Sequence, residues 1–196
     1  METRAGEAAL IARVLGGERE AYAELVRAHT QIAHRTAVLL GAGADAEDVV
    51  QTAFLKAYQS LGRFRAEASF RPWLLRIVAN ETKNTVRSVH RLRTAVEREA
   101  ALVEAEPVIP ESADPAAAAV ADERRRRLLA ALDELSDEHR QVVTYRYLLD
   151  LDEAETAQAL GRPRGTVKSR LNRALRHLER LLGPDKVEAS ARRGGR

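Results

Sequence analysis

The feature that most constrains the fold is an acidic segment rich in proline and alanine in the middle of the chain. It reads LVEAEPVIPESADPAAAAVADE, and the stretch 99–123 around it carries seven acidic residues and no basic ones. This composition is typical of a linker rather than of a packed element. In a chain of 196 residues it predicts two small domains instead of one large core. We expect an N-terminal domain at 1–98, a linker at 99–123, a C-terminal domain at 124–183 and a basic tail at 184–196.

The N-terminal half has the apolar spacing of helices and no convincing strand. Apolar residues recur at helical spacing along 21–33, and at alternating intervals of three and four from Ala46 to Leu61, a stripe that includes Tyr58. Asp45 is placed to cap the second of these helices. Ser69 can cap a third helix, which has a proline in its first turn, where the missing N–H does no harm.

The C-terminal half predicts a helix-turn-helix. Ser136 is placed to cap one helix, and Asp152 with Glu155 forms the pattern of a capping box before the next. A Gly-Arg-Pro turn at 161–163 then leads into the helix 164–182, which has leucines on one face and basic or polar residues on the other. The predicted fold class is all-α: two small helical domains joined by the acidic linker, the second containing the helix-turn-helix.

Charge is distributed unevenly, although the net charge is only +3. Residues 63–98 include nine basic and three acidic residues, and residues 124–183 include thirteen basic and nine acidic ones. Two basic blocks therefore flank the acidic linker. Two separated basic surfaces favour two contacts with nucleic acid. Arg and Lys can pair with guanine and Asn with adenine in a duplex, which fits helix 164–182. A solvated, membrane-surface or partner-binding helix is the alternative.

The first basic block suits single-stranded nucleic acid. Opposite the apolar face of the third helix, Arg76, Asn80, Lys83, Asn84, Arg87 and Arg91 recur at helical spacing. The loop GRFRAEASF precedes them, and cations beside aromatic rings are typical of sites that hold unpaired bases. We assign Phe70 and Trp73 to the core, and Phe64 with the loop arginines to contacts with the strand.

Catalytic and cofactor sites are not expected. Gly41, Gly43 and Ala46 have the spacing of a dinucleotide-binding motif. However, acidic residues occupy the start of the following helix, where a pyrophosphate would bind. The five histidines are scattered and cysteine is absent, so neither a metal site nor a nucleophile motif is indicated. We predict a protein without enzymatic activity, cofactor or metal.

The sequence also predicts a cytoplasmic protein without direct membrane insertion. The N-terminus METRAGEAALIARVLGG lacks the order of a signal peptide. No apolar run approaches the roughly 20 residues that cross a bilayer, and the absence of cysteine fits a reducing compartment.

Two segments together resemble one protein family. DAEDVVQTAFLKAYQSLGRFRAEASFRPWLLRIVANETKN, from Asp45 to Asn84, and LDELSDEHRQVVTYRYLLDLDEAETAQALGRPRGTVKSRLNRALRHL, from Leu132 to Leu178, resemble the extracytoplasmic-function (ECF, group 4) sigma factors of bacterial RNA polymerase. The second segment alone also resembles response-regulator output domains. Asp150 stands where the family often has glycine, and aspartate adopts a left-handed turn less readily.

The resemblance implies an alternative sigma factor that binds the clamp coiled coil and the flap of core RNA polymerase. It implies recognition of the minus-thirty-five element as duplex and of the minus-ten element as non-template single strand, with melting of the promoter. It also implies an anti-sigma partner. The residues it implies for core polymerase binding are Asp45, Glu47, Asp48, Gln51 and Lys56.

The resemblance assigns DNA-contacting residues to both domains. For the minus-ten element they are Arg63, Phe64, Arg65, Ser69, Arg76, Asn80, Lys83, Asn84 and Arg87. For the minus-thirty-five element they are Arg164, Thr166, Lys168, Ser169, Asn172, Arg173 and Arg176. Two alternatives remain: a free-standing dimeric helix-turn-helix regulator, and an interaction protein that mimics a sigma factor without needing the basic faces.

Overall fold

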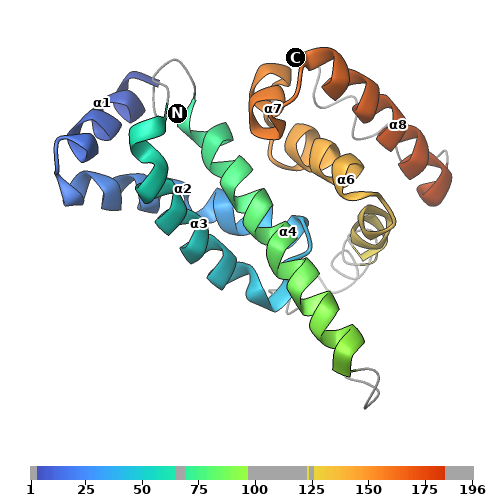
Figure 1. The fold of residues 1–196 in the computed structure, drawn as a ribbon. Helices are drawn as coiled ribbons and strands as arrows, with labels where there is room; N and C mark the ends of the chain where they lie inside the picture. The colour runs from blue at the N-terminus through green and yellow to red at the C-terminus, as the bar shows by residue number, and fades with distance from the viewer. Residues whose placement is uncertain (1–3, 65–68, 97–122, 124–125, 184–196) are drawn as a thin grey trace, which may run out of the picture.

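The computed structural model describes residues 4–64, 69–96, 123 and 126–183, and every regular element in these ranges is helical (Figure 1). The predicted all-α class is confirmed. The elements are α1 (Arg4–Leu15), α2 (Arg19–Leu39), η1 (Gly43–Asp45), α3 (Ala46–Ser60), η2 (Leu61–Arg63), α4 (Phe70–Val96), a helical segment at 126–133, α6 (Asp137–Val143), the π-helical turn η3 (Thr144–Leu148), α7 (Glu153–Leu160) and α8 (Arg164–Leu182). The predicted linker, apart from Glu123, and the basic tail lie outside the described residues.

The N-terminal core lies between α2, α3 and α4, with α1 closing one side. Leu25, Val49 and Phe70 are among its buried side chains, and the alternating spacing along each helix brings these residues to one face. The placement of Phe70 in the core is confirmed. Helix α1 had no counterpart among the sequence predictions, and it adds Ile11 and Val14 to this core.

One residue of the predicted apolar stripe is only partly covered. Tyr58 lies at the edge of the apolar stripe of α3 with 45% of its surface exposed, so the stripe is not buried along its whole width. Its ring packs against that of Tyr22 at an interplanar angle of 60°, with the centroids 4.8 Å apart. An aromatic side chain at the edge of a helical stripe satisfies the apolar spacing while only its inner side is covered.

The C-terminal core joins the segment 126–133, α6 and α8. Val142, Val167 and Leu178 are buried in it. The leucine face of α8 therefore packs inward, as its spacing predicts, and the basic face of the same helix turns away from this core.

A third apolar cluster, which we call the interdomain cluster, lies where the two domains meet. Because α4 and α7 contact each other, the two halves pack together with α4 between α2–α3 and α7 (Figure 1). The sequence did not predict this packing. Its buried members are Leu40, Leu75 and Ala79 from the N-terminal domain and Tyr145, Leu149, Leu151 and Ala159 from the C-terminal domain.

The predicted helix caps have mixed outcomes. The Asp152–Glu155 capping box is confirmed: each residue's backbone N–H donates to the other's carboxylate, at 2.9 and 2.8 Å. Asp45 and Ser136 precede α3 and α6 as predicted, but neither side chain makes a capping hydrogen bond. At Asp45 the 3-10 turn η1 runs directly into α3, so the backbone does not take the extended form that aims a capping side chain.

Asp150 takes the left-handed backbone conformation, with φ of 52°, and it is the only residue other than glycine with a positive φ in the described part of the chain. It therefore adopts the turn despite the absence of glycine. The turn places Leu149 and Leu151, on either side of it, into the interdomain cluster.

Candidate nucleic-acid interface

The helix-turn-helix is built as its sequence predicts. Helix α7 ends at Gly161, whose left-handed conformation (φ 60°) turns the chain, and Pro163 precedes the first residue of α8. Arg170 anchors α8 to α6, because its guanidinium donates to Glu138 at 2.9 Å. These contacts fix the direction in which the outer face of α8 points.

The candidate duplex-reading residues lie together on α8. Arg164, Lys168, Asn172, Arg173 and Arg176 are exposed, whereas Thr166 and Ser169 are half-buried. The Ser169 hydroxyl donates to the backbone oxygen of Thr166 at 3.0 Å. The first two turns of the helix therefore offer exposed guanidinium, ammonium and amide groups, which are suited to base edges and phosphates.

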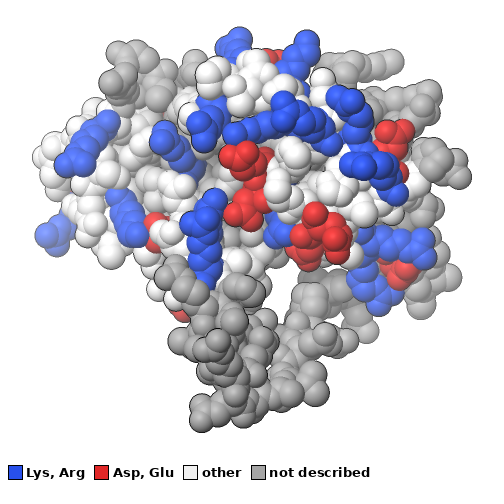
Figure 2. All heavy atoms as spheres, turned by 45° about the vertical axis from the view of Figure 1, so that its right-hand side comes forward, with Lys and Arg blue, Asp and Glu red and all other residues white. Residues whose placement is uncertain are grey.

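A second polar face runs along α4, and we call it the minus-ten face after the predicted role of its residues. Arg76, Asn80, Asn84 and Arg87 are exposed there, and Lys83 is half-buried. The Lys83 ammonium forms an ion pair with Asp137 of α6, with Nζ and Oδ2 3.3 Å apart. The structure thus gathers the α4 candidates on one surface, which the C-terminal domain contacts. Figure 2 shows Lys and Arg side chains spread across one side of the molecule, around a cluster of acidic atoms.

The loop before α4 is only partly described. Arg63 is exposed at its start, and Arg65 lies outside the described residues. Phe64 is half-buried, with its ring 5.2 Å from that of Trp73 and 6.0 Å from that of Phe70. Ser69 is buried, and its backbone oxygen accepts a hydrogen bond of 2.8 Å from the Gln158 amide of α7. Phe64 therefore joins an aromatic group at the edge of the N-terminal core.

The outer face of α3 holds the candidates for polymerase binding. Glu47, Asp48, Gln51 and Lys56 are exposed on it, and Asp45 is half-buried just before it. Lys56 is held by Glu81 of α4, at 2.7 Å. Leu55, which is 58% exposed on the same helix, was not among the residues predicted from the sequence. The signal in the sequence that could have identified Leu55 is that it is an apolar residue outside the apolar stripe of α3.

Neither a metal cluster nor a membrane span is found in the described ranges. No group of three or more His, Asp or Glu side chains there is arranged to hold an ion. None of the helices described is both long and apolar enough to cross a bilayer. Of the histidines, His29 is buried in the N-terminal domain, where its ring nitrogens contact the backbone oxygen of Leu25 and the carboxylate of Glu7.

Comparison with known proteins matches both halves. The Sigma-70 region 2 family matches residues 21–92, and the Sigma-70, region 4 family matches residues 125–178. The ECF RNA polymerase sigma-E factor of Escherichia coli K12 is 31% identical over 183 residues, covering 89% of this chain and 93% of that protein. The ECF RNA polymerase sigma factor SigM of Mycobacterium tuberculosis is 36% identical over 178 residues, covering 90% of this chain and 85% of that protein.

The chain belongs to the ECF RNA polymerase sigma factors. The resemblance seen in the sequence is thereby confirmed, and with it the function of a transcription initiation factor that binds core polymerase and recognises promoters. The region 2 match covers most of α2, all of α3 and most of α4, and the region 4 match covers α6, α7 and most of α8.

Two solved structures share the fold of this sigma factor. CnrH in complex with the cytosolic domain of CnrY matches with a TM-score of 0.68 at 24% identity, covering 92% of this chain and 99% of that one. The sigma factor RpoE in complex with the anti-sigma factor NepR from Bartonella quintana matches with a TM-score of 0.65 at 23% identity, covering 84% and 98%.

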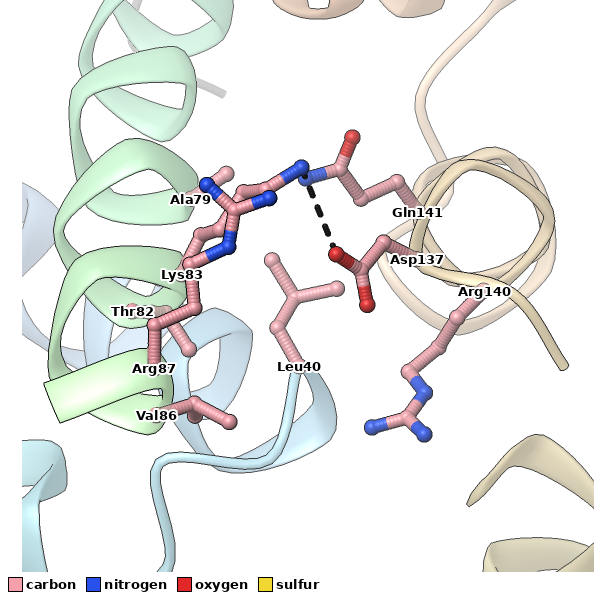
Figure 3. A pocket seen from close by; sticks show the side chains of 9 residues that line it. All are labelled: Leu40, Ala79, Thr82, Lys83, Val86, Arg87, Asp137, Arg140 and Gln141. Atoms are coloured by element: carbon pink, nitrogen blue, oxygen red, sulfur yellow. Dashed lines mark ion pairs between the residues drawn. The ribbon is translucent and has the colours of Figure 1, made fainter. Parts of the chain in front are cut away.

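A cavity in this sigma factor opens at the contact between its two domains. Figure 3 shows Lys83 reaching from α4 toward Asp137 of α6, with Leu40 beside the pair. The cavity is therefore bounded by part of the minus-ten face and by the start of α6. Its lining consists of Leu40, Ala79, Thr82, Lys83, Val86, Arg87, Asp137, Arg140 and Gln141.

Proposed function

We propose that this sigma factor divides promoter recognition between its two basic faces. Residues 1–98 bind core polymerase and recognise and melt the minus-ten element, the linker at 99–123 spans the gap, and 124–183 read the minus-thirty-five element. The single observation that carries this division is the separation of the exposed polar groups of α8 from those of α4 on different domains.

The energetics of strand opening favour two sites with different tasks. Opening the duplex costs a few kcal/mol per unstacked base step, and holding an extruded base recovers that cost only if the register is fixed. A duplex contact by α8 fixes the register, and a linker makes the second contact intramolecular. We assign the minus-ten contacts to Arg63, Phe64, Arg65, Ser69 and the minus-ten face, and the polymerase contacts to Asp45, Glu47, Asp48, Gln51 and Lys56.

Run-off transcription with purified core polymerase and a set of genomic promoters tests the proposal. We expect transcripts that require the sigma factor, and co-purification with core enzyme. A free-standing dimeric regulator would instead bind a palindromic duplex tightly without polymerase. Absence of both transcription and core binding would refute the proposal.

The base-reading role of α8 has its own test. Asn172→Ala and Arg173→Ala each remove an exposed group from its second turn. We expect each to weaken discrimination between matched and mismatched minus-thirty-five duplexes by about 1–3 kcal/mol, the size of a bidentate base contact. Glu179→Ala, at the exposed far end of α8, is the control and should not change discrimination. An equal loss on all duplexes would reduce the role to phosphate contact.

We further propose that the protein acts in the cytoplasm, has no enzymatic activity of its own, and is held inactive by an anti-sigma factor that covers its polymerase- and DNA-binding faces. RpoE of Bartonella quintana, which shares the fold, was solved in complex with the anti-sigma factor NepR. Co-purification from cells grown without the inducing stress tests this. The expected result is one protein that binds the sigma factor in competition with core polymerase.

A further inference from the structure

The outer face of α8 begins with a residue that has no side chain. Gly165 is the second residue of the helix and is exposed. It starts a row that continues with Ser169, Asn172 and Arg176, at intervals of four, three and four residues, and the buried residues of α8 lie on the opposite side. The helix lies on the side of the C-terminal domain that faces away from α4 (Figure 1). The row of duplex-reading residues is therefore open to a partner, and its first position is bare backbone.

Neither backbone conformation nor packing requires glycine at position 165. Gly161, four residues earlier, has a left-handed backbone, and a Cβ added there would lie 3.1 Å from Cζ of Arg76. Gly165 does not have a positive φ. A Cβ added to it would have no heavy atom of the described residues within 4 Å, apart from its chain neighbours and the backbone of its own turn. Since glycine is the poorest helix former after proline, the folded chain itself would be better served by alanine.

We propose that Gly165 lets the first turn of α8 enter the major groove of the minus-thirty-five duplex more deeply than a side chain would allow. The inference rests on the proposed function of α8. The first residues of a recognition helix meet the base edges, and glycine is the residue that allows a backbone to approach a ligand closely. Gly165 is thus a positioning residue, which sets the depth at which the other residues of the row reach the bases.

The depth of entry affects base contacts and phosphate contacts differently. A methyl group at position 165 extends from the helix by the length of one carbon–carbon bond, about 1.5 Å. Hydrogen bonds have donor–acceptor distances of about 3 Å and are lost a few tenths of an ångström beyond this range. The short amide of Asn172 cannot follow such a shift, whereas the long side chains of Arg164 and Lys168 can still reach phosphates. The added methyl should therefore reduce sequence discrimination more than general affinity for DNA.

Binding of the holoenzyme to two promoter duplexes tests the inference. One duplex is a promoter identified by the run-off experiment, and the other is the same duplex with its minus-thirty-five element replaced. We expect Gly165→Ala to lower the affinity of the holoenzyme for the first duplex about tenfold, the size of one lost bidentate base contact, and to change its affinity for the second less than twofold. Gly165→Leu should lose at least as much discrimination. Discrimination equal to that of the parent in both variants would overturn the proposal.

Gly6→Ala is the matched control. Gly6 is exposed on α1, and a Cβ added there also has no heavy atom of the described residues within 4 Å, with the same exceptions. Both alanine variants should keep or raise the midpoint of thermal unfolding, by up to about 4 °C, but only Gly165→Ala should lose discrimination. Destabilisation by Gly165→Ala would show that the fold itself needs the glycine, and would overturn the proposal. An equal loss of discrimination in Gly6→Ala would overturn it as well.

Asn172→Ala distinguishes failure of this inference from failure of the proposed function. If Asn172→Ala loses discrimination and Gly165→Ala does not, α8 keeps its reading role and the inference about Gly165 is refuted. If the parent holoenzyme binds the two duplexes equally well, the proposed reading role of α8 is refuted, and the inference that rests on it is refuted too. A variant that gains thermal stability while it loses discrimination is the result that only the proposed positioning role predicts.

Discussion

At the scale of single residues, Asp150 shows how one unfavourable backbone conformation serves packing. Its positive φ sends Leu149 and Leu151 into the interdomain cluster. Glycine takes this conformation without strain, whereas a β-branched residue does not. We expect Asp150→Gly to leave the free energy of unfolding unchanged or raise it by up to about 1 kcal/mol, and Asp150→Val to lower it by about 1–2 kcal/mol. Urea denaturation followed by circular dichroism measures both, and a stabilising Val would contradict the account.

Thr144 offers a second test at this scale. It is fully buried, and its hydroxyl has no partner among the described residues. Burying an unpaired hydroxyl costs about 1–3 kcal/mol, so Thr144→Val should raise the free energy of unfolding. Thr36 is equally buried, but its hydroxyl donates to the backbone oxygen of Ile32 at 2.6 Å. Thermal unfolding measures both variants. Thr36→Val is the control and should bring no gain in the free energy of unfolding.

At the scale of helices, the caps show that a residue in the capping position does not always make the capping hydrogen bond. Asp152 accepts a hydrogen bond in a complete capping box, whereas Ser136 occupies the same position before α6 without one. Losing a capping bond costs about 0.5–2 kcal/mol. We expect Asp152→Ala to destabilise the protein by that amount and Ser136→Ala by clearly less. Equal losses in urea denaturation would show that the side-chain bonds are not what stabilises α7.

The sequence predicts these elements well because each depends on neighbours three or four residues away. The stripe of α3, the capping box and the two faces of α8 are all local patterns. The polar candidates on α4 also follow from helical spacing. Tyr58 is the exception, since spacing cannot distinguish the centre of a buried stripe from its edge.

At the scale of the whole molecule, the packing of region 4 on region 2 could not be predicted. Tyr145 and Leu75 are 70 residues apart, and Gln158 and Ser69 are 89 apart. No period links such residues, and the linker composition by itself indicated separate domains. Gln158 and Arg71 also look like ordinary surface residues in the sequence, and only the fold gives them partners across the contact.

The same contact predicts how stability depends on alkaline pH. Burial raises the pKa of Tyr145 above its ordinary value of about 10, and burial raises the pKa of Tyr22 to about 12. In the unfolded chain both phenols lose their protons near pH 10. The folded state then binds more protons than the unfolded state above that pH, so stability is fully present below about pH 10 and falls as the pH rises further.

Tyr145→Phe tests this dependence at the contact between the domains. At pH 8 the variant should lose about 0.5–1.5 kcal/mol, because the hydrogen bond to Leu75 is gone. Between pH 9.5 and 11.5 its free energy of unfolding should fall less steeply than that of the parent, since one phenol no longer titrates on unfolding. Tyr147→Phe, at a half-buried position outside the interdomain cluster, is the control. Parallel curves for the parent and Tyr145→Phe would mean that the Tyr145 phenol is already accessible to solvent, and hence that the domains stand apart in solution.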